Sequence, residues 1–181
     1  MELILETQVA GIRLEHPIMN AAGTCKSLED VQKLARSASA AIMVGSITVE
    51  QRAGNAGDVL WIGTIFSLNS LGLPNRGASY YRKALPEMAA IAHESGNPLF
   101  VSVAGFSPQE YADLTELAFD GGADLVELNL GCPNVWEGGT QKRIACFDPA
   151  LTAEILHRVE GRVGAEAAVS VHASSIRTHW P

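Results

Sequence analysis

Two short segments contain the residues whose types and spacing could do chemistry. Residues 67–75 read Ser-Leu-Asn-Ser-Leu-Gly-Leu-Pro-Asn, and residues 127–134 read Glu-Leu-Asn-Leu-Gly-Cys-Pro-Asn. Asn129 lies at the end of a predicted buried strand, and Asn134 lies just beyond it. Cys132 lies between Asn129 and Asn134, and a loop thiol can act as a base when its surroundings tune its pKa. By spacing alone, a small apolar filler stays the favoured alternative for Cys132, and the first segment reads equally well as a turn-rich loop.

Several other classes of site are absent from the sequence. The three cysteines, at 25, 132 and 146, form no CxxC pair, and the five histidines are scattered. This spacing argues against a zinc site and against a disulfide framework, so no metal is expected. Neither nucleotide-binding glycine fingerprint occurs, and there is no GxSxG motif. The formal net charge is −7, which makes nucleic acid and anionic membrane surfaces poor partners.

No membrane span or targeting segment is predicted. The longest apolar run, around residues 38–44, is far shorter than the roughly 18 residues that a membrane span needs. The N-terminus has two acidic residues and no basic cluster, so we expect no secretory signal. Sparse, widely spaced cysteines are typical of a reducing compartment, and we predict a cytoplasmic protein.

Strands and helices are predicted to alternate, which favours an α/β protein with a parallel sheet, either half of a (β/α)8 barrel or a complete open sheet of four or five strands. The first residues predict a hairpin of two short strands, 4–9 and 12–15. Apolar runs then predict strands at 17–23, 40–48, 98–105, 124–130 and 167–173. Helical spacing predicts helices at 28–36, 86–94, 108–119 and 149–159. Residues 49–80 show no strong periodicity, and an irregular segment of about 30 residues is usually functional. In such folds, ligands bind at the C-terminal ends of the strands.

The predicted helix starts carry capping signals. Ser27 with Asp30 reads as a capping box, and so does Ser107 with Glu110. Pro86 is predicted in the first turn of its helix, where a missing N–H does no harm.

Three motifs, in order and at matching spacing, resemble the dihydroorotate dehydrogenase family. They are 69–75 followed by Tyr-Tyr at 80–81, then 100–105, then 127–134. Residues 52–55, Arg-Ala-Gly-Asn, also resemble the family's stretch after the second strand. The resemblance is to the soluble class, class 1, which carries cysteine at the position of the base.

The resemblance implies a TIM (β/α)8 barrel, of which the chain would supply the N-terminal half with an N-terminal β-hairpin. Residues 1–160 would form this half, and 161–181 would be an atypical tail that suggests a truncation or an altered reading frame. The family's C-terminal half, with a second flavin lysine and the loops for the FMN phosphate, has no counterpart here. A homodimer that completes the sheet is one expectation.

The resemblance also implies FMN as the cofactor and oxidation of dihydroorotate to orotate in pyrimidine biosynthesis. Cys132 would be the base that takes the proton. The residues expected to bind the small-molecule substrate are Asn69, Leu71, Gly72, Leu73, Asn129 and Asn134. The residues expected to line the flavin are Ala21, Ala22, Gly23 and Ser46.

The sequence departs from the family at its cations. The family usually has a lysine beside the flavin and the substrate carboxylate, where this sequence has Gly45. Loss of that charge should weaken binding of both, and Lys26 and Lys142 are the candidate substitutes. His172 or Arg177 falls near the position of the second lysine. Two alternatives therefore stay open: a related pyrimidine-active flavin oxidoreductase with another substrate, or an inactive half-barrel.

Overall fold

Four parallel strands form the centre of the protein, for which the computed structural model describes residues 5–137 and 140–173. The strands are β3 (Ile42–Ile47), β6 (Leu99–Val103), β7 (Leu125–Asn129) and β10 (Val169–His172). Their order across the sheet is β10-β7-β6-β3, and every neighbouring pair is parallel. The predicted α/β fold with a parallel sheet is confirmed, including the strand expected at 167–173.

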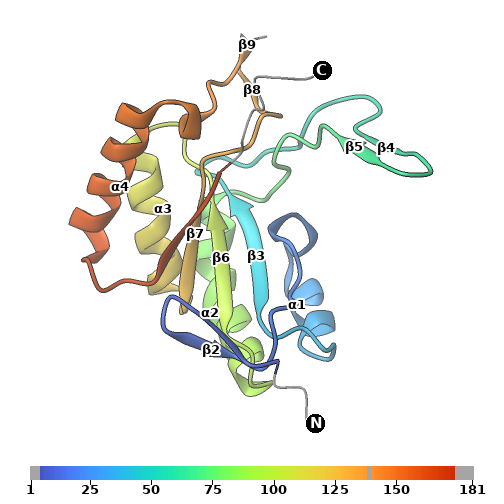
Figure 1. Ribbon diagram of the computed structural model, residues 1–181, viewed down its shortest axis with the longest axis vertical. Coiled ribbons are helices and arrows are strands. Elements are labelled where there is room, and N and C mark those ends of the chain that lie inside the picture. The colour runs from blue at the N-terminus through green and yellow to red at the C-terminus, as the bar shows by residue number, and fades with distance from the viewer. Residues whose placement is uncertain (1–4, 138–139, 174–181) are drawn as a thin grey trace.

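Four helices alternate with these strands. They are α1 (Leu28–Leu34), α2 (Ala78–Glu94), α3 (Pro108–Asp120) and α4 (Pro149–Val163). Figure 1 shows α3 and α4 packed side by side at one flank of the sheet, with α1 beside β3 at the other. Because the strands are parallel, their carboxyl ends meet at one edge of the sheet, and the loops that follow them converge there.

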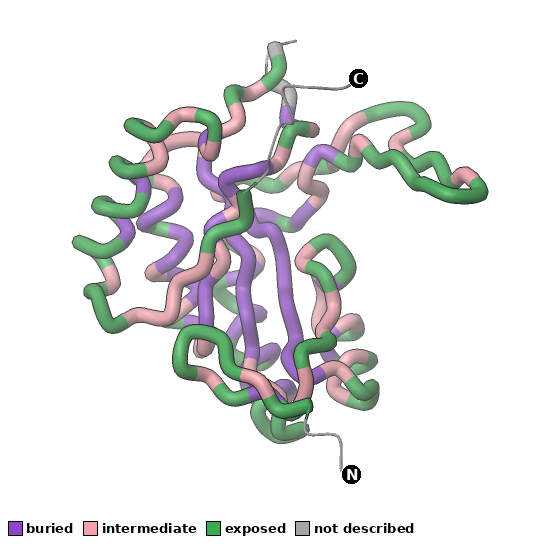
Figure 2. Tube along the Cα trace, in the orientation of Figure 1, coloured by how far each residue is buried: buried purple, intermediate pink, exposed green. Residues whose placement is uncertain are grey.

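The main hydrophobic core lies between the strands and the helices. Tyr81 and Leu85 of α2 are fully buried, as is Val101 of β6. A smaller cluster, which includes Leu14 and Phe100, forms a second core. Burial of each large apolar side chain stabilises the fold by about 1.5–3 kcal/mol. Figure 2 shows that the buried backbone follows the central strands and that exposed residues follow the outer loops.

The predicted N-terminal hairpin is confirmed. Strands β1 (Thr7–Val9) and β2 (Ile12–Leu14) pair antiparallel around a turn at Ala10 and Gly11. Both turn residues have positive φ, 47° and 84°, the conformation that two-residue hairpin turns require. Leu14 is buried in the smaller cluster, so the hairpin packs against the body of the protein.

The strand predicted at 17–23 is wrong, because a side chain replaces the backbone ladder there. The Nδ2 atom of Asn20 donates to the Met43 carbonyl at 2.8 Å, and the Met43 N–H donates to Asn20 Oδ1 at 2.9 Å. The segment therefore lies along β3 without strand geometry. It continues into a short 3-10 helix, η1 (Ala22–Thr24).

Residues 49–80 are less irregular than predicted. They contain an antiparallel hairpin of β4 (Leu60–Ile62) and β5 (Ser67–Asn69), which Figure 1 shows extending away from the sheet. All six strand residues are exposed, so the hairpin lacks the alternation of apolar and polar residues that makes a half-buried strand recognisable.

The start predicted for the helix at 86–94 is wrong as well. Helix α2 begins at Ala78, and Pro86 lies in its interior. An interior proline costs about 3 kcal/mol or more. Burial of Tyr81, Leu85 and Met88 on one face of the helix offsets this cost, so tertiary packing overrides the local signal.

The predicted caps are largely confirmed. Ser27 and Asp30 form a complete capping box at α1. At α3, Ser107 accepts from the Glu110 N–H at 3.2 Å, but the Glu110 carboxylate accepts from the Phe106 N–H at 2.7 Å, so this capping box is not formed.

The loop after β7 contains three short elements, and the helix after it is longer than predicted. The elements are β8 (Trp136–Glu137), β9 (Thr140–Gln141) and the 3-10 helix η2 (Ala145–Phe147). Helix α4 runs to Val163 rather than to 159. The boundary predicted at residue 160 stays a prediction, and residues 174–181, with Arg177, lie outside the described residues. Within the described ranges, no helix is long and apolar enough to cross a membrane.

Candidate active site

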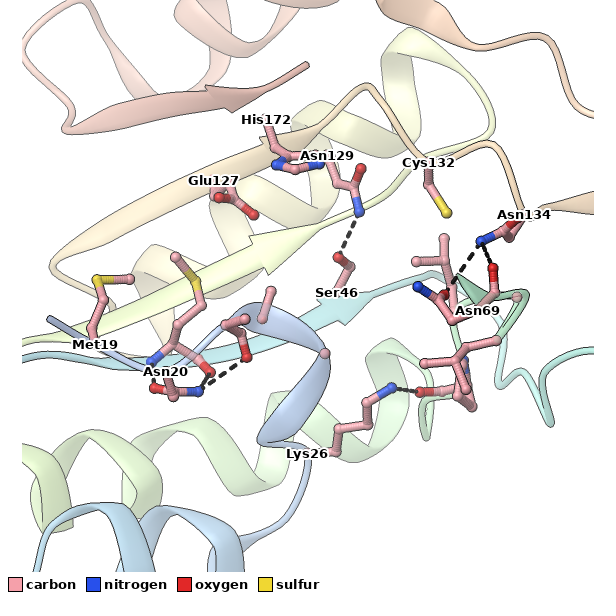
Figure 3. A pocket seen from close by; sticks show the side chains of 18 residues that line it. Met19, Asn20, Lys26, Ser46, Asn69, Glu127, Asn129, Cys132, Asn134 and His172 are labelled. Carbon is pink, nitrogen blue, oxygen red and sulfur yellow. Dashed lines mark hydrogen bonds between the residues drawn. The ribbon is translucent and has the colours of Figure 1, made fainter. Parts of the chain in front are cut away.

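One cavity of about 370 Å³ opens at the carboxyl ends of the strands. It is the place where all eleven residues singled out in the sequence come together (Figure 3). These residues are Ala21, Ala22, Gly23, Ser46, Asn69, Leu71, Gly72, Leu73, Asn129, Cys132 and Asn134. The segments that supply them are far apart in the chain, and the parallel sheet brings them to one site. The roles expected of the individual residues stay predictions.

Asn129, at the end of β7, is held in a polar network across three strands. Its Nδ2 donates to Ser46 Oγ at 2.9 Å, and Ser46 Oγ lies 2.8 Å from Ser102 Oγ. The Tyr111 hydroxyl donates to the Asn129 backbone carbonyl at 2.8 Å. The Oδ1 atom of Asn129 is buried and has no hydrogen-bond partner among the described residues. An unsatisfied buried acceptor costs about 1–3 kcal/mol, so this oxygen is suited to a ligand N–H.

Asn69, the last residue of β5, and Asn134, in the loop after β7, contact each other at the cavity. Asn134 Nδ2 donates to the backbone carbonyl of Asn69 at 3.0 Å and lies 3.4 Å from its Oδ1 (Figure 3). This contact joins the end of β5 to the loop after β7. Both side chains line the cavity, so both can reach a ligand bound there.

Another part of the lining is made of small and apolar residues. Ala21, Ala22 and Gly23 line the cavity together with Met19 and Met43. Since the first three carry at most one side-chain carbon each, this part of the lining leaves room for a flat ring. A mostly apolar lining with a few fixed polar groups is typical of small-molecule sites.

Lys26 is the one lysine or arginine among the residues that line this cavity. Its ammonium donates to the backbone carbonyl of Pro74, which also lines the cavity (Figure 3). The side chain is half-buried, and desolvation lowers the pKa of Lys26. A desolvated cation beside a cavity gains by pairing with an anionic group.

Lys142 and His172, the other two described candidates, differ in whether they line the cavity. Lys142 does not line the main cavity; its ammonium donates to the Gly105 carbonyl and lies 4.3 Å from the ring centroid of Phe106. His172, at the end of β10, does line the cavity and pairs in register with Asn129. Glu127, two residues before Asn129 on the same strand, lines it as well, as the alternation of a strand predicts.

Gly45 leaves no room for a side chain. Its φ is +118°, and a Cβ atom built there would lie 2.3 Å from the Ser102 carbonyl oxygen. With this backbone, β3 therefore cannot present a lysine at position 45.

Cys132 lines two cavities. One is the cavity described above, and the other is a small cavity of about 10 Å³ that Lys142 and Tyr111 also line. The smaller volume is close to what a single water molecule needs. Among the described residues, no group of histidine, cysteine and acidic side chains could hold a metal ion.

A parallel α/β fold whose strand ends bring together a thiol, several amides and a lysine is typical of enzymes that act on small polar molecules. The family model described as dihydroorotate dehydrogenase matches residues 4–173. The chain therefore belongs to the dihydroorotate dehydrogenase family, whose enzymes are flavin-dependent oxidoreductases built on a TIM barrel.

Curated relatives agree with this assignment. A probable dihydroorotate dehydrogenase A (fumarate) from Streptococcus pneumoniae is 35% identical over 132 residues, which is 72% of this chain and 42% of the relative. The dihydroorotate dehydrogenase (fumarate) of Lachancea kluyveri is 37% identical over 147 residues, 80% of this chain and 45% of the relative. The dihydroorotate dehydrogenase (fumarate) of Kluyveromyces lactis is 35% identical over 161 residues, which is 88% of this chain and 50% of the relative. The chain spans about half the length of the curated relatives that it matches.

Proposed function

We propose that this chain carries the substrate-binding and proton-abstracting part of an FMN-dependent dihydroorotate dehydrogenase, which oxidises dihydroorotate to orotate in pyrimidine biosynthesis. The observation that carries the proposal is that the thiol, the three asparagines and the small-residue lining all line one cavity. Sequence identity above 30% to relatives named dihydroorotate dehydrogenase supports the proposal.

The substrate is a planar or nearly planar ring with N–H and C=O groups and one carboxylate. Asn129 Oδ1, buried and without a partner among the described residues, would accept a ring N–H. Asn69 and Asn134 would donate to and accept from the other ring groups. Lys26 would pair with the carboxylate, for which it is the one lysine or arginine in the lining.

Cys132 would act as the base. Oxidation of the ring removes a proton from one carbon and a hydride from its neighbour, and Cys132 Sγ, as the thiolate, would take the proton. Its position at the cavity supports this role, because a base must come within hydrogen-bond reach of the proton that it removes.

Ala21, Ala22, Gly23 and Ser46 would hold the ring system of FMN. The fit rests on the small side chains of the first three residues, which leave room for a flat aromatic surface, and on the Ser46 hydroxyl beside them. When bound, FMN supplies the acceptor for the hydride.

Binding and reduction measured separately test this function. With FMN added in excess, orotate binding is measured by calorimetry, and dihydroorotate is expected to bleach the flavin absorbance. Cys132→Ala should slow the bleaching by about 100-fold or more, because it removes the base, while the orotate Kd stays within about threefold. Failure of the unmodified chain to bind orotate in the presence of FMN would contradict the proposal.

A related pyrimidine is the second candidate substrate, and Gly45 favours it because β3 supplies no cation. Calorimetry with uracil and with orotate separates the two. Orotate should bind more tightly if Lys26 pairs with the carboxylate. Tighter binding of the neutral uracil would instead assign the site to another pyrimidine.

Two further proposals concern where and how the protein acts. We propose a cytoplasmic location, supported by the need of a thiol base for reducing conditions. Fractionation of the source cells tests this location.

We also propose a homodimer, supported by exposed Trp61, Ile62 and Ile65 on the β4–β5 hairpin. Light scattering should then give twice the mass of one chain, and the monomer mass would contradict it.

A further inference from the structure

The segment that follows β3 lies against residues 70–75, the loop that follows Asn69. The N–H of Arg52 donates to the Asn75 carbonyl and the N–H of Asn75 donates to the Arg52 carbonyl, both at 2.9 Å. Three residues on, the N–H of Asn55 donates to the Leu71 carbonyl at 3.0 Å. The loop beside the cavity is therefore held along its length by residues 52–55.

Two glycines allow this close approach. A Cβ atom on Gly54 would lie 2.5 Å from the Leu71 carbonyl oxygen, and one on Gly72 would lie 2.5 Å from Asn55 Oδ1. Both glycines have positive φ, +90° and +75°, which other residues rarely adopt. Each of the two segments therefore has a glycine at the point where the other segment comes closest.

The Asn55 side chain reaches beyond this contact to the loop after β7. Its Nδ2 donates to the Ser70 carbonyl at 2.9 Å and lies 3.1 Å from Ser70 Oγ. The same Nδ2 donates to the Asn134 carbonyl at 2.9 Å. Asn55 itself does not line the cavity. One amide therefore bonds to both loops, directly beside Asn69 on one and at Asn134 on the other.

We propose that Asn55 is a positioning residue, which fixes the loop of Asn69 and the loop of Asn134 relative to each other so that both amides meet one ligand. Asn134 and Asn69 both line the cavity, where a ligand would compete for their contact, whereas Asn55 does not line it, so a ligand need not displace its hydrogen bonds. The identity of that ligand as orotate rests on the proposed function.

The first test needs no ligand. Asn55→Asp keeps the shape of the side chain but places an acceptor against two backbone carbonyls, those of Ser70 and Asn134, so both loops should lose order. Hydrogen exchange read by mass spectrometry should become about tenfold faster in peptides covering 69–75 and 131–137 together. Asn97→Asp is the matched control, because the Asn97 Nδ2 also donates to a backbone carbonyl, that of Ser39, away from the cavity. It should leave both peptides unchanged.

A second variant separates local from global effects. Asn55→Ala removes the donor without adding charge, and it should accelerate exchange in the same two peptides even if Asn55→Asp does not fold. Faster exchange in one loop only, in neither loop, or equally in all peptides would overturn the proposal.

Orotate affinity provides the functional readout. With FMN in excess, each Asn55 variant that folds should raise the orotate Kd by about tenfold or more, and Asn97→Asp should leave it within about threefold. An unchanged Kd in an Asn55 variant whose loops exchange faster would overturn the positioning role. If the unmodified chain fails to bind orotate, the proposed function fails, and the exchange experiment still decides whether Asn55 couples the loops.

Discussion

Two lysines near the carboxyl ends of the strands, Lys26 and Lys142, make the same kind of hydrogen bond but lie in different surroundings. Each ammonium donates to a backbone carbonyl of a neighbouring loop, Pro74 for Lys26 and Gly105 for Lys142. Lys26 lines the main cavity, and burial lowers its pKa. Lys142 instead lies over an aromatic ring, that of Phe106.

The difference shows what makes a cation available to a ligand. The Tyr111 ring also lies near Lys142, at 5.8 Å, so the charge faces two ring quadrupoles as well as a carbonyl. Within the described residues, one hydrogen-bond acceptor is found for the Lys26 ammonium. Lys26 therefore has more to gain from an anionic ligand, although Lys142 is the closer of the two to Cys132 in the sequence.

Lys26 and Lys142 are the candidate cations only if β3 cannot supply one at position 45, and substitution of Gly45 has the largest expected effect. Gly45→Ala should lower the free energy of unfolding by about 3 kcal/mol or more, because the new Cβ meets the Ser102 carbonyl. Gly161→Ala in α4 is the matched control, since nothing lies within 4 Å of its Cβ position. Chemical denaturation of both variants measures the difference, and equal stabilities would contradict it.

Removing the two charges tests the comparison directly. Lys26→Met should raise the orotate Kd by about 30-fold, since a hydrogen bond to a charged group is worth about 2 kcal/mol. Lys142→Met should change the Kd by less than about threefold. Calorimetry in the presence of FMN reads both values, and the reverse order would assign the carboxylate to Lys142.

The lowered pKa of Lys26 predicts a dependence on pH. The folded protein loses this charge as the pH rises through the lowered pKa, below the ordinary lysine value of about 10.4, so orotate affinity should fall there. Because the unfolded chain keeps the proton longer, stability should rise with pH over the same window. Lys26→Arg should keep orotate affinity flat to higher pH. A flat profile for the unmodified chain would show that Lys26 does not hold the carboxylate.

The smallest expected effect concerns the aromatic contact of Lys142. Lys142→Met should lower the free energy of unfolding by about 0.5–1 kcal/mol, through loss of the interaction with the Phe106 ring. Phe106→Leu should have a similar effect, and the double variant should cost less than the sum of the two. Additive costs would show that the ring and the ammonium are not coupled.

The sequence predicted the parts of this molecule that local patterns encode. Apolar runs and capping signals predicted the bounds of β6, α3 and β7 to within one or two residues. These elements are predictable because their burial pattern and their caps depend on residues that are close together in the sequence. The residues singled out around Asn69 and Cys132 line one cavity, and the roles expected of them stay predictions.

The remainder depends on contacts between distant residues. The β4–β5 hairpin was missed because its exposed strands carry no burial pattern. The pairing of Asn20 with Met43 joins residues 23 positions apart, and that of Lys26 with Pro74 joins residues 48 apart. The choice between Lys26 and Lys142 was therefore not readable from the sequence.

The segment beside β3 has a consequence for association between molecules. Four backbone groups at that edge are already bonded: the Ala40 N–H to the Ile18 carbonyl, the Gly45 N–H to the Cys25 carbonyl, and both the N–H and the carbonyl of Met43 to the Asn20 amide. Exposed strand edges recruit strands from other chains and so begin aggregates. Because one asparagine side chain occupies both backbone groups of Met43, this edge is closed to such recruitment, and the opposite edge, at β10, is where a foreign strand would add.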